Sequence, residues 1–391
     1  MSPYTVSPSK KLPNETILQI FHECTAEEFI HVRALSERPI NTKQTTLYAL
    51  SAVSRRWREL SGDLPGWRRV VIDHEDDLGP GHRKPVPWKD EYGTVLQRVL
   101  EVAKKSGRAI EVKVDIADSW PDDGREMLES PALTRLVQSE VPWKGFEYIL
   151  FPFTSMDWLC NTLEFVRVKF ENWEYFGVAM EDGPMADDSH SVADVLGKVI
   201  DMPKLQRLEL ELGWKGDWEW RNWRAWPSFP QLTVRDLRMR ANETACVMVL
   251  KMCPRLATAD IFVEGREGDE LNDETRPPDD GMDVWLRELR LLRLGIGLGE
   301  HSWAGVLNRL HCPALQYFTF EWLSADPPEV RTGVTAFQRF VDTPRGTPLT
   351  GEVYFPMARG QDAEFIESRG LKKLVSPTLD HHHARPFLSV E

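Results

Sequence analysis

The chain has few cysteines, no long apolar run and fewer basic than acidic residues. Its five cysteines are an odd and sparse set among 391 residues, which favours a reducing compartment, the cytosol and/or the nucleus, over a secreted disulfide scaffold. No run of about 18 apolar residues occurs, and residues 1–11 lack the apolar segment of a signal peptide, so we expect no membrane span and no membrane partner. The formal net charge of −13 disfavours direct nucleic-acid binding.

Catalytic and metal-binding motifs are also missing from the sequence. There is no P-loop, no G-x-S-x-G elbow and no C-x-x-C pair. Gly295, Gly297 and Gly299 alternate without the spacing of a dinucleotide loop, which indicates a bend instead. The histidines of 381–383 lie in a tail, and residues 74–77 form a polar turn without a partner group. We therefore expect no catalytic residue, no metal, no cofactor and no enzymatic activity.

Two short amphipathic segments stand near the N-terminus. The first, Leu12 to Phe21, places Pro13 at the first helical position, where its fixed φ and missing N–H are tolerated. The second is expected as one helix whose apolar stripe is Leu47, Leu50, Val53, Trp57 and Leu60. Two such helices are too small to bury their own stripes, so the rest of the chain or a partner must cover part of that surface.

These two segments resemble the F-box, in the form that precedes repeat domains in many fungal proteins. The family pattern reads Leu-Pro-x-Glu-x-(Ile/Leu)-Leu-x-x-Ile-Phe and, after a variable stretch, Val-(Cys/Ser)-(Arg/Lys)-x-Trp. The residues that match it are Leu12, Pro13, Glu15, Ile17, Leu18, Ile20 and Phe21, then Val53, Ser54, Arg55 and Trp57. Gly66 precedes Trp67, where the family usually has leucine.

The resemblance implies docking onto a Skp-type adaptor and, through it, onto a cullin in an SCF-type ubiquitin ligase. The residues that it implies for adaptor binding are Leu12, Pro13, Glu15, Ile17, Leu18, Ile20, Phe21, Leu50, Val53, Ser54 and Trp57. Catalysis in that assembly resides in other subunits, which agrees with the lack of catalytic motifs.

Beyond the module, apolar residues recur at offsets 0, 3 and 5. This spacing is typical of the leucine-rich repeat, a short strand that an anchoring leucine introduces. The copies begin at Leu163, Leu205, Val234, Leu256, Leu286, Leu315 and, weakly, Leu371. A degenerate copy is expected between the last two, around 334–340 and 353–355.

Helical segments fill the gaps between these strands, at 191–200, 242–252 and 301–310. Strand alternating with helix predicts an α/β fold: an N-terminal helical F-box-like module followed by an irregular leucine-rich-repeat solenoid with a parallel sheet. The expected divisions are a tail (1–11), the F-box-like helical module (12–73), a linker loop (74–90), the solenoid (91–378) and a C-terminal tail (379–391). A helix at 92–105 and strands at 110–116 and 146–153 are the expected first units.

Two stretches of unusual composition are candidates for target binding. The first contains five tryptophans, Trp214, Trp218, Trp220, Trp223 and Trp226. Packing of an enlarged loop is the favoured interpretation, and exposed rings would make it the first candidate for a target-binding surface. The acidic insertion Glu264–Asp283 is interpreted first as a loop and second as a recruiter of basic partners.

The leading functional interpretation is a substrate receptor whose solenoid binds an unknown protein destined for ubiquitination and degradation. The alternative is a non-catalytic leucine-rich-repeat scaffold whose F-box-like module only caps the solenoid. An enzyme within a divergent repeat fold is the least favoured class.

Overall fold

The computed structural model divides the chain into two units. It describes residues 12–25, 30–33, 46–62, 64–73, 90–116, 130–150, 156–180, 192–212, 232–241, 243–263, 283–297, 304–322, 327–346, 348–354, 368–369 and 371–373. Of these, residues up to 149 and residues 165–169 belong to unit 1, and the others belong to unit 2.

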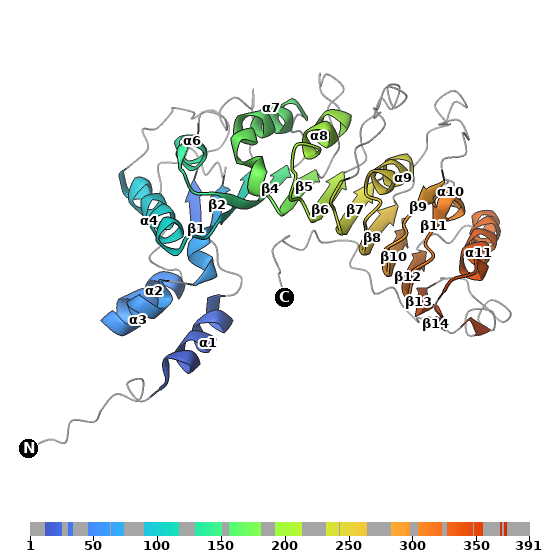
Figure 1. Ribbon diagram of the computed structural model, residues 1–391, viewed down its shortest axis with the longest axis horizontal. Helices are drawn as coiled ribbons and strands as arrows, with labels where there is room; N and C mark the ends of the chain where they lie inside the picture. Colours follow the sequence, from blue (N-terminus) through green and yellow to red (C-terminus); the bar gives the residue numbers. More distant parts are fainter. Residues whose placement is uncertain are drawn as a thin grey trace, which may run out of the picture. The chain divides into compact units, whose positions relative to one another are not determined.

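Unit 1 combines a helical N-terminal region with a parallel sheet (Figure 1). Its helices are α1 (Asn14–Thr25), α2 (Thr46–Val53), α3 (Arg55–Ser61), the 3₁₀ turn η3 (Pro65–Arg68), α4 (Asp90–Ser106) and α6 (Pro131–Gln138). Its strands are β1 (Ile30–Arg33), β2 (Arg69–Asp73), β3 (Ile110–Ile116) and β4 (Trp143–Leu150), in the order β1-β2-β3-β4. Because β1 and β2 pair in parallel and β2 pairs with β3, the N-terminal region supplies two strands to the sheet.

The single helix expected across the second amphipathic segment is wrong, because Ser54 divides it. Ser54 has extended backbone angles (φ −160°, ψ 168°), and its Oγ accepts a hydrogen bond from the Trp57 N–H at 3.1 Å. Serine in this conformation is a preferred N-cap, so α3 starts anew after it. The first helix also begins one residue later than expected, at Asn14, and the Pro13 carbonyl accepts its first hydrogen bond from the Ile17 N–H at 3.2 Å.

Unit 2 contains a large parallel sheet with helices between its strands. The helical elements are α7 (Met156–Val166), η4 (Arg167–Asn172), α8 (Val192–Val199), α9 (Glu243–Met252), α10 (Ala304–Arg309) and α11 (Pro327–Asp342). Residues 165–169, at the end of α7 and the start of η4, are assigned to unit 1. The strands in spatial order are β5 (Tyr175–Met180), β6 (Arg207–Leu212), β7 (Asp236–Ala241), β8 (Thr258–Val263), β10 (Leu291–Ile296), β12 (Tyr317–Trp322), β13 (Thr350–Tyr354) and β14 (Leu371–Lys373). A separate pair joins β9 (Val284–Trp285) to β11 (Leu310–His311).

One backbone pattern recurs at the entry to successive strands of unit 2. A single carbonyl accepts hydrogen bonds from two consecutive N–H groups of the neighbouring strand. The Glu174 carbonyl binds the N–H groups of Gln206 and Arg207 at 2.9 and 3.0 Å, and the Gln206 carbonyl binds those of Arg235 and Asp236 at 2.7 and 3.0 Å. The series continues at the carbonyls of Arg235, Ala257 and Arg290. These bonds define the frame of each structural repeat.

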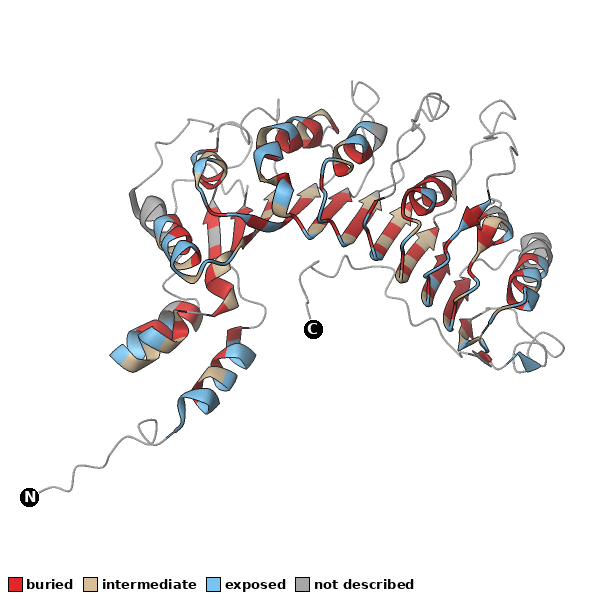
Figure 2. Cartoon of the chain, viewed as in Figure 1, coloured by how far each residue is buried: buried red, intermediate tan, exposed pale blue. Residues whose placement is uncertain are grey.

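The residue before each repeated carbonyl is a buried anchor. These anchors are Trp173, Leu205, Val234, Leu256 and Leu289, and the residues three and five positions after each are buried as well. Leu315 occupies the same place before Gln316, whose carbonyl accepts a single backbone hydrogen bond, from the Thr350 N–H at 2.9 Å. Figure 2 shows the resulting alternation along the strands, and Figure 1 shows α8, α9 and α10 on one face of the sheet. Apolar side chains therefore fill the space between strands and helices, while the other face carries polar residues.

The strands expected at Leu205, Val234, Leu256 and Leu315 are confirmed. The strand expected over 163–170 is wrong, because these residues complete α7 and form η4. Offsets 0, 3 and 7 also fit one face of a helix, so that stretch satisfied two periodicities at once.

The position that distinguishes them is Val168, which a strand would bury and which is 75% exposed. The copy expected to begin at Leu286 was placed three residues too early. Its anchor is Leu289, and the buried residues Leu292 and Leu294 follow three and five positions later. The helices expected at 191–200 and 242–252 are confirmed within two residues of each end, and that at 301–310 within three.

Unit 1 uses tryptophan where unit 2 mostly uses leucine. Trp67 is fully buried ahead of β2, and Val70 and Ile72 are buried three and five positions after it. Trp143 stands in the same relation to two buried aromatic residues of β4. The end of the N-terminal region is therefore itself a strand unit of the same kind.

The turns at Cys253-Pro254 and Cys312-Pro313 are closed by buried cysteines. The Cys253 carbonyl accepts a hydrogen bond from Leu256, and the Cys312 carbonyl accepts one from Leu315, both at 3.2 Å. Burial raises the pKa of each thiol to about 12. Both thiols therefore stay protonated at neutral pH, which suits a packing role rather than a reactive one.

Candidate functional site

The N-terminal helices form a small core of their own. On α1 the buried residues are Ile17, Phe21 and Thr25, four apart, which places them on one face of the helix. The Phe21 ring meets the Trp57 ring of α3 edge to face, with centroids 4.8 Å apart and planes at 65°. This aromatic pair fastens α1 to α3.

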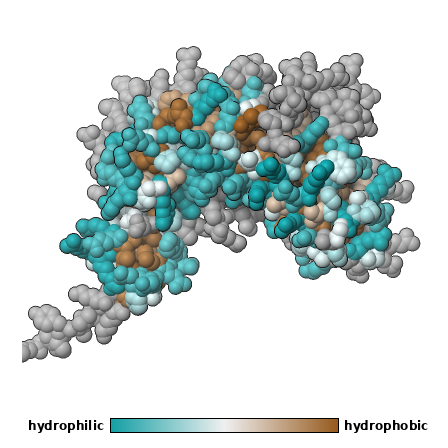
Figure 3. Space-filling view, in the orientation of Figure 1, coloured by the Kyte–Doolittle hydropathy of each residue, from teal (hydrophilic) through white to brown (hydrophobic). Residues whose placement is uncertain are grey.

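Three large apolar side chains of the same region are exposed. Leu12 is 39% exposed, Ile20 45% and Val53 58%. They come from the start of α1, its solvent-facing side and the end of α2. Figure 3 shows hydrophobic side chains gathered over this helical region within a hydrophilic surround. An apolar centre with a polar rim is the usual composition of a protein interface.

Arg56 fixes the start of α1 against the junction between α2 and α3. Its Nε donates to Asn14 Oδ1 at 2.9 Å, and its Nη2 donates to the same oxygen at 2.6 Å and to the Leu12 carbonyl at 2.7 Å. Since Arg56 follows Val53 by only three residues, this clamp brings Leu12 close to the end of α2. No pattern in the sequence indicates this clamp, because Arg56 occupies the variable position of the motif.

Charged residues around this junction are exposed. Arg55 pairs with Glu59 at 3.0 Å across one helical turn, with both side chains largely in solvent. Such a pair adds only about 0.3–0.5 kcal/mol to the helix. Arg58 donates from Nε to the Ser51 carbonyl at 3.0 Å and so closes the break between α2 and α3.

The eleven residues expected to bind an adaptor fall into two groups. Those with exposed or half-buried side chains are Leu12, Pro13, Glu15, Leu18, Ile20, Val53, Ser54 and Trp57. The other three, Ile17, Phe21 and Leu50, are buried at 1%, 0% and 9% exposure. The buried three pack inside the module, so their side chains are not available at its surface.

The module is held to the sheet of unit 1 by a buried tryptophan and an ion pair. The Arg98 guanidinium of α4 lies 4.8 Å from the centre of the Trp67 ring, within cation–π range. Arg69 Nε lies 3.1 Å from Glu111 Oε2, and both side chains are mostly buried. These contacts attach the end of the module to β3 and α4.

The family comparison matches this segment. Residues 10–73 match the F-box-like family. They form an F-box-like domain. The match covers the two motif halves, the exposed apolar side chains and β1 and β2. No curated protein matches the chain.

The candidate target-binding residues are not placed by the structure. Trp214, Trp218, Trp220, Trp223 and Trp226 lie outside the described residues, as does the acidic insertion up to residue 282. Among the residues that are described, no helix has the length and apolar content needed to cross a membrane. Within the same ranges, no group of three or more His, Cys, Asp or Glu residues is placed to hold a metal ion.

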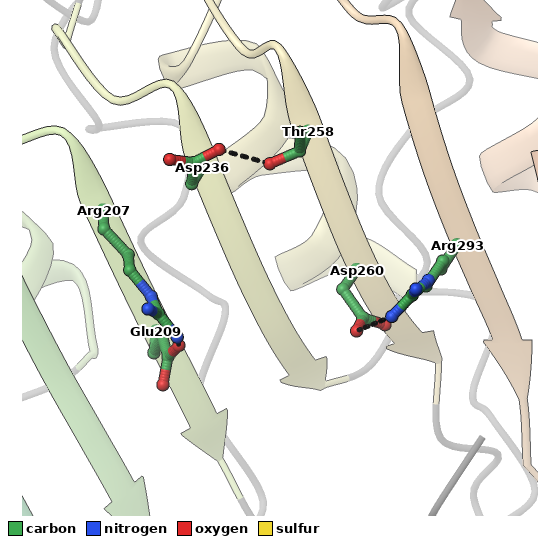
Figure 4. A network of polar contacts seen from close by, with 6 residues as sticks. All are labelled: Arg207, Glu209, Asp236, Thr258, Asp260 and Arg293. Carbon is green, nitrogen blue, oxygen red and sulfur yellow. Dashed lines mark hydrogen bonds and ion pairs between the residues drawn. The ribbon is translucent and has the colours of Figure 1, made fainter. Parts of the chain in front are cut away.

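The polar face of unit 2 carries charges that alternate across neighbouring strands. Glu209, Arg238, Asp260 and Arg293 occupy aligned positions on β6, β7, β8 and β10. Figure 4 shows Arg293 reaching Asp260, 3.9 Å away, and Thr258 donating to Asp236. Opposite charges on paired strands are worth about 0.2–1 kcal/mol each. The row neutralises itself, so it offers no strong field of one sign.

Glu209 is the least solvated member of this row. It is fully buried, and its Oε1 accepts a hydrogen bond from Arg207 Nε at 2.8 Å. Burial raises the pKa of the Glu209 carboxyl, although the Arg207 guanidinium opposes that shift. The folded protein therefore holds this proton more tightly than the unfolded chain does, and stability falls as the pH rises through the folded pKa.

We expect Glu209→Gln to remove that loss, because the amide keeps the size of the side chain and does not ionise. Urea midpoints of the variant and the wild type, compared between about pH 4 and pH 8, measure it. As the pH rises, the urea midpoint of the variant should increase relative to that of the wild type. A difference that is independent of pH would contradict the raised pKa.

Proposed function

We propose that this protein is a substrate receptor of an SCF-type ubiquitin ligase. In this proposal the F-box-like domain binds a Skp-type adaptor and through it a cullin, and the rest of the chain binds a protein target. The observation that carries it is the exposure of Leu12, Ile20 and Val53 within the segment that matches the F-box-like family. Exposed apolar side chains on a preorganised surface are stabilised when a partner covers them.

We further infer that the repeated strand-and-helix units are divergent leucine-rich repeats. Their support is the recurring carbonyl pattern and the buried residues at offsets 0, 3 and 5. Such repeats provide a surface for a protein target and need no catalytic group of their own. We place this activity in the cytosol and/or the nucleus.

The test is binding of a recombinant Skp-type adaptor to the full chain, measured by calorimetry and by size-exclusion chromatography. The wild type should form a 1:1 complex. Val53→Asp should weaken it at least about 10-fold, because a charge at the apolar centre of an interface is desolvated without a partner. Val168→Asp is the matched control, because Val168 is also an exposed valine but lies outside the F-box-like domain. Equal loss in both variants would contradict the proposed surface.

A second function has one observation in its favour. The F-box-like domain donates β1 and β2 to the sheet of unit 1, as a cap would. A scaffold whose F-box-like domain only caps the sheet would form no adaptor complex even as wild type. The same binding experiment therefore separates the two proposals.

A further inference from the structure

Trp285 is the most exposed of the described tryptophans. It is 54% exposed, whereas Trp67, Trp143, Trp173 and Trp322 are fully buried. It lies on β9, which pairs with β11 and lies near α9 in unit 2, outside the F-box-like domain. Exposure of an indole to water is unfavourable, so an exposed tryptophan indicates a surface that a partner can cover.

The orientation of the Trp285 ring is fixed by stacking on a histidine. Trp285 and His311 are paired positions of β9 and β11, and their rings stack with centroids 4.3 Å apart and planes at 14°. His311 Nε2 in turn lies 3.2 Å from Asp283 Oδ1. The His311 carbonyl accepts a hydrogen bond from the Leu286 N–H at 2.9 Å. The indole is therefore preorganised, with one face on the imidazole and a carboxylate beside the stack.

The chain places its own arginines over other aromatic rings. Guanidinium carbons lie 4.8 Å from the Trp67 ring, 5.5 Å from Tyr175, 5.5 Å from Phe262 and 4.7 Å from Phe340. Over the Trp285 ring, no arginine or lysine of the described ranges is placed. Asp283 is 55% exposed, so its carboxylate is open to a cation from outside.

We propose that Trp285 and Asp283 form a binding site for an arginine side chain of a partner protein. The guanidinium stacks on the open face of the indole and donates hydrogen bonds to the Asp283 carboxylate. Both interactions favour a planar cation, because arginine stacks on rings and pairs with carboxylates in a fixed geometry that lysine cannot reproduce. The net charge of −13 attracts basic segments toward the chain and repels nucleic acid, the other common stacking ligand.

The experiment uses full-length protein labelled with 5-fluorotryptophan and observed by fluorine NMR. The chain has 15 tryptophans, and the Trp285 resonance is the one that disappears in Trp285→Phe. N-acetyl-arginine amide is titrated as the probe, and N-acetyl-citrulline amide, of the same shape without the charge, is its control. We expect the Trp285 resonance to shift with the arginine compound and to stay in place with citrulline.

Asp283→Asn should raise the dissociation constant of the arginine compound about two- to fivefold, the range of an exposed ion pair. A Trp285 resonance that does not move, or that moves equally with citrulline, overturns the site. An unchanged dissociation constant in Asp283→Asn overturns the role of the carboxylate. The proposal requires no adaptor, so its failure leaves the SCF proposal standing, and loss of adaptor binding leaves this site standing.

Discussion

Gly351→Ala should destabilise unit 2 by about 4 kcal/mol or more, a cost that few single substitutions reach. Gly351 has φ +149°, a conformation that side chains with a Cβ rarely adopt. A Cβ at this position would lie 1.9 Å from the Phe318 carbonyl oxygen and 2.7 Å from its carbonyl carbon. These are backbone atoms of the neighbouring strand, so no side-chain rotation relieves the clash.

The clash falls on a position that holds the end of the sheet together. Gly351 is paired with Phe318 of β12 on one side and with Leu371 of β14 on the other. Moving β13 away from β12 also displaces Val353 and Leu371, which are buried. We therefore expect the loss of β13 and β14 from the sheet, or unfolding of the unit at lower denaturant.

Gly197→Ala is the matched control. Gly197 lies within α8, has no atom within 4 Å of the position of an added Cβ, and does not have positive φ. Alanine should stabilise this helix by about 0.5–1 kcal/mol. Urea unfolding followed by hydrogen exchange reports both changes and locates them. Equal midpoints for the two variants would show that the contact at Gly351 is not as tight as the structure places it.

Most of the alternating architecture could be predicted from apolar spacing, because burial on one face forces a period of two in strands. Apolar spacing could not decide which residue is the anchor of a strand, or whether a segment is a strand or a helix. Leu163, Val166 and Phe170 fit a strand with its anchor and a helix equally, and only the exposure of Val168 separates them. The anchors Trp67, Trp143 and Trp173 were missed because the pattern sought an aliphatic residue.

The F-box-like segment could be predicted from its motif, but which of its side chains are exposed could not. A sequence motif mixes residues that a fold buries with residues that it exposes, and helical spacing does not say which side a partner will take. Ile17 and Ile20 are three apart in the same motif, yet one is 1% and the other 45% exposed. The clamp from Arg56 to Leu12 joins residues 44 positions apart, which no local pattern contains.

Phe21→Ala should open the F-box-like domain, with a loss of about 3–5 kcal/mol in its local stability. The ring is fully buried and forms the edge-to-face contact with Trp57, so its removal leaves a cavity between α1 and α3. Aromatic pairs add about 0.5–1.5 kcal/mol beyond the area that they bury. Hydrogen exchange of the amides of α1 and α3 measures the change, while those of unit 2 serve as an internal reference.

Ile20→Ala is the control on the same helix, since Ile20 precedes Phe21 but is 45% exposed. The opening free energies that hydrogen exchange gives for α1 and α3 in this variant should match those of the wild type within about 0.5 kcal/mol. If the proposed surface binds an adaptor, Ile20→Ala weakens the complex without loosening the domain, because it removes contact area alone. Phe21→Ala weakens it through the fraction of molecules in which α1 has detached, so added stabiliser restores binding to this variant and not to Ile20→Ala. Equal exchange in the two variants would contradict the division of the motif into a buried face and an exposed face.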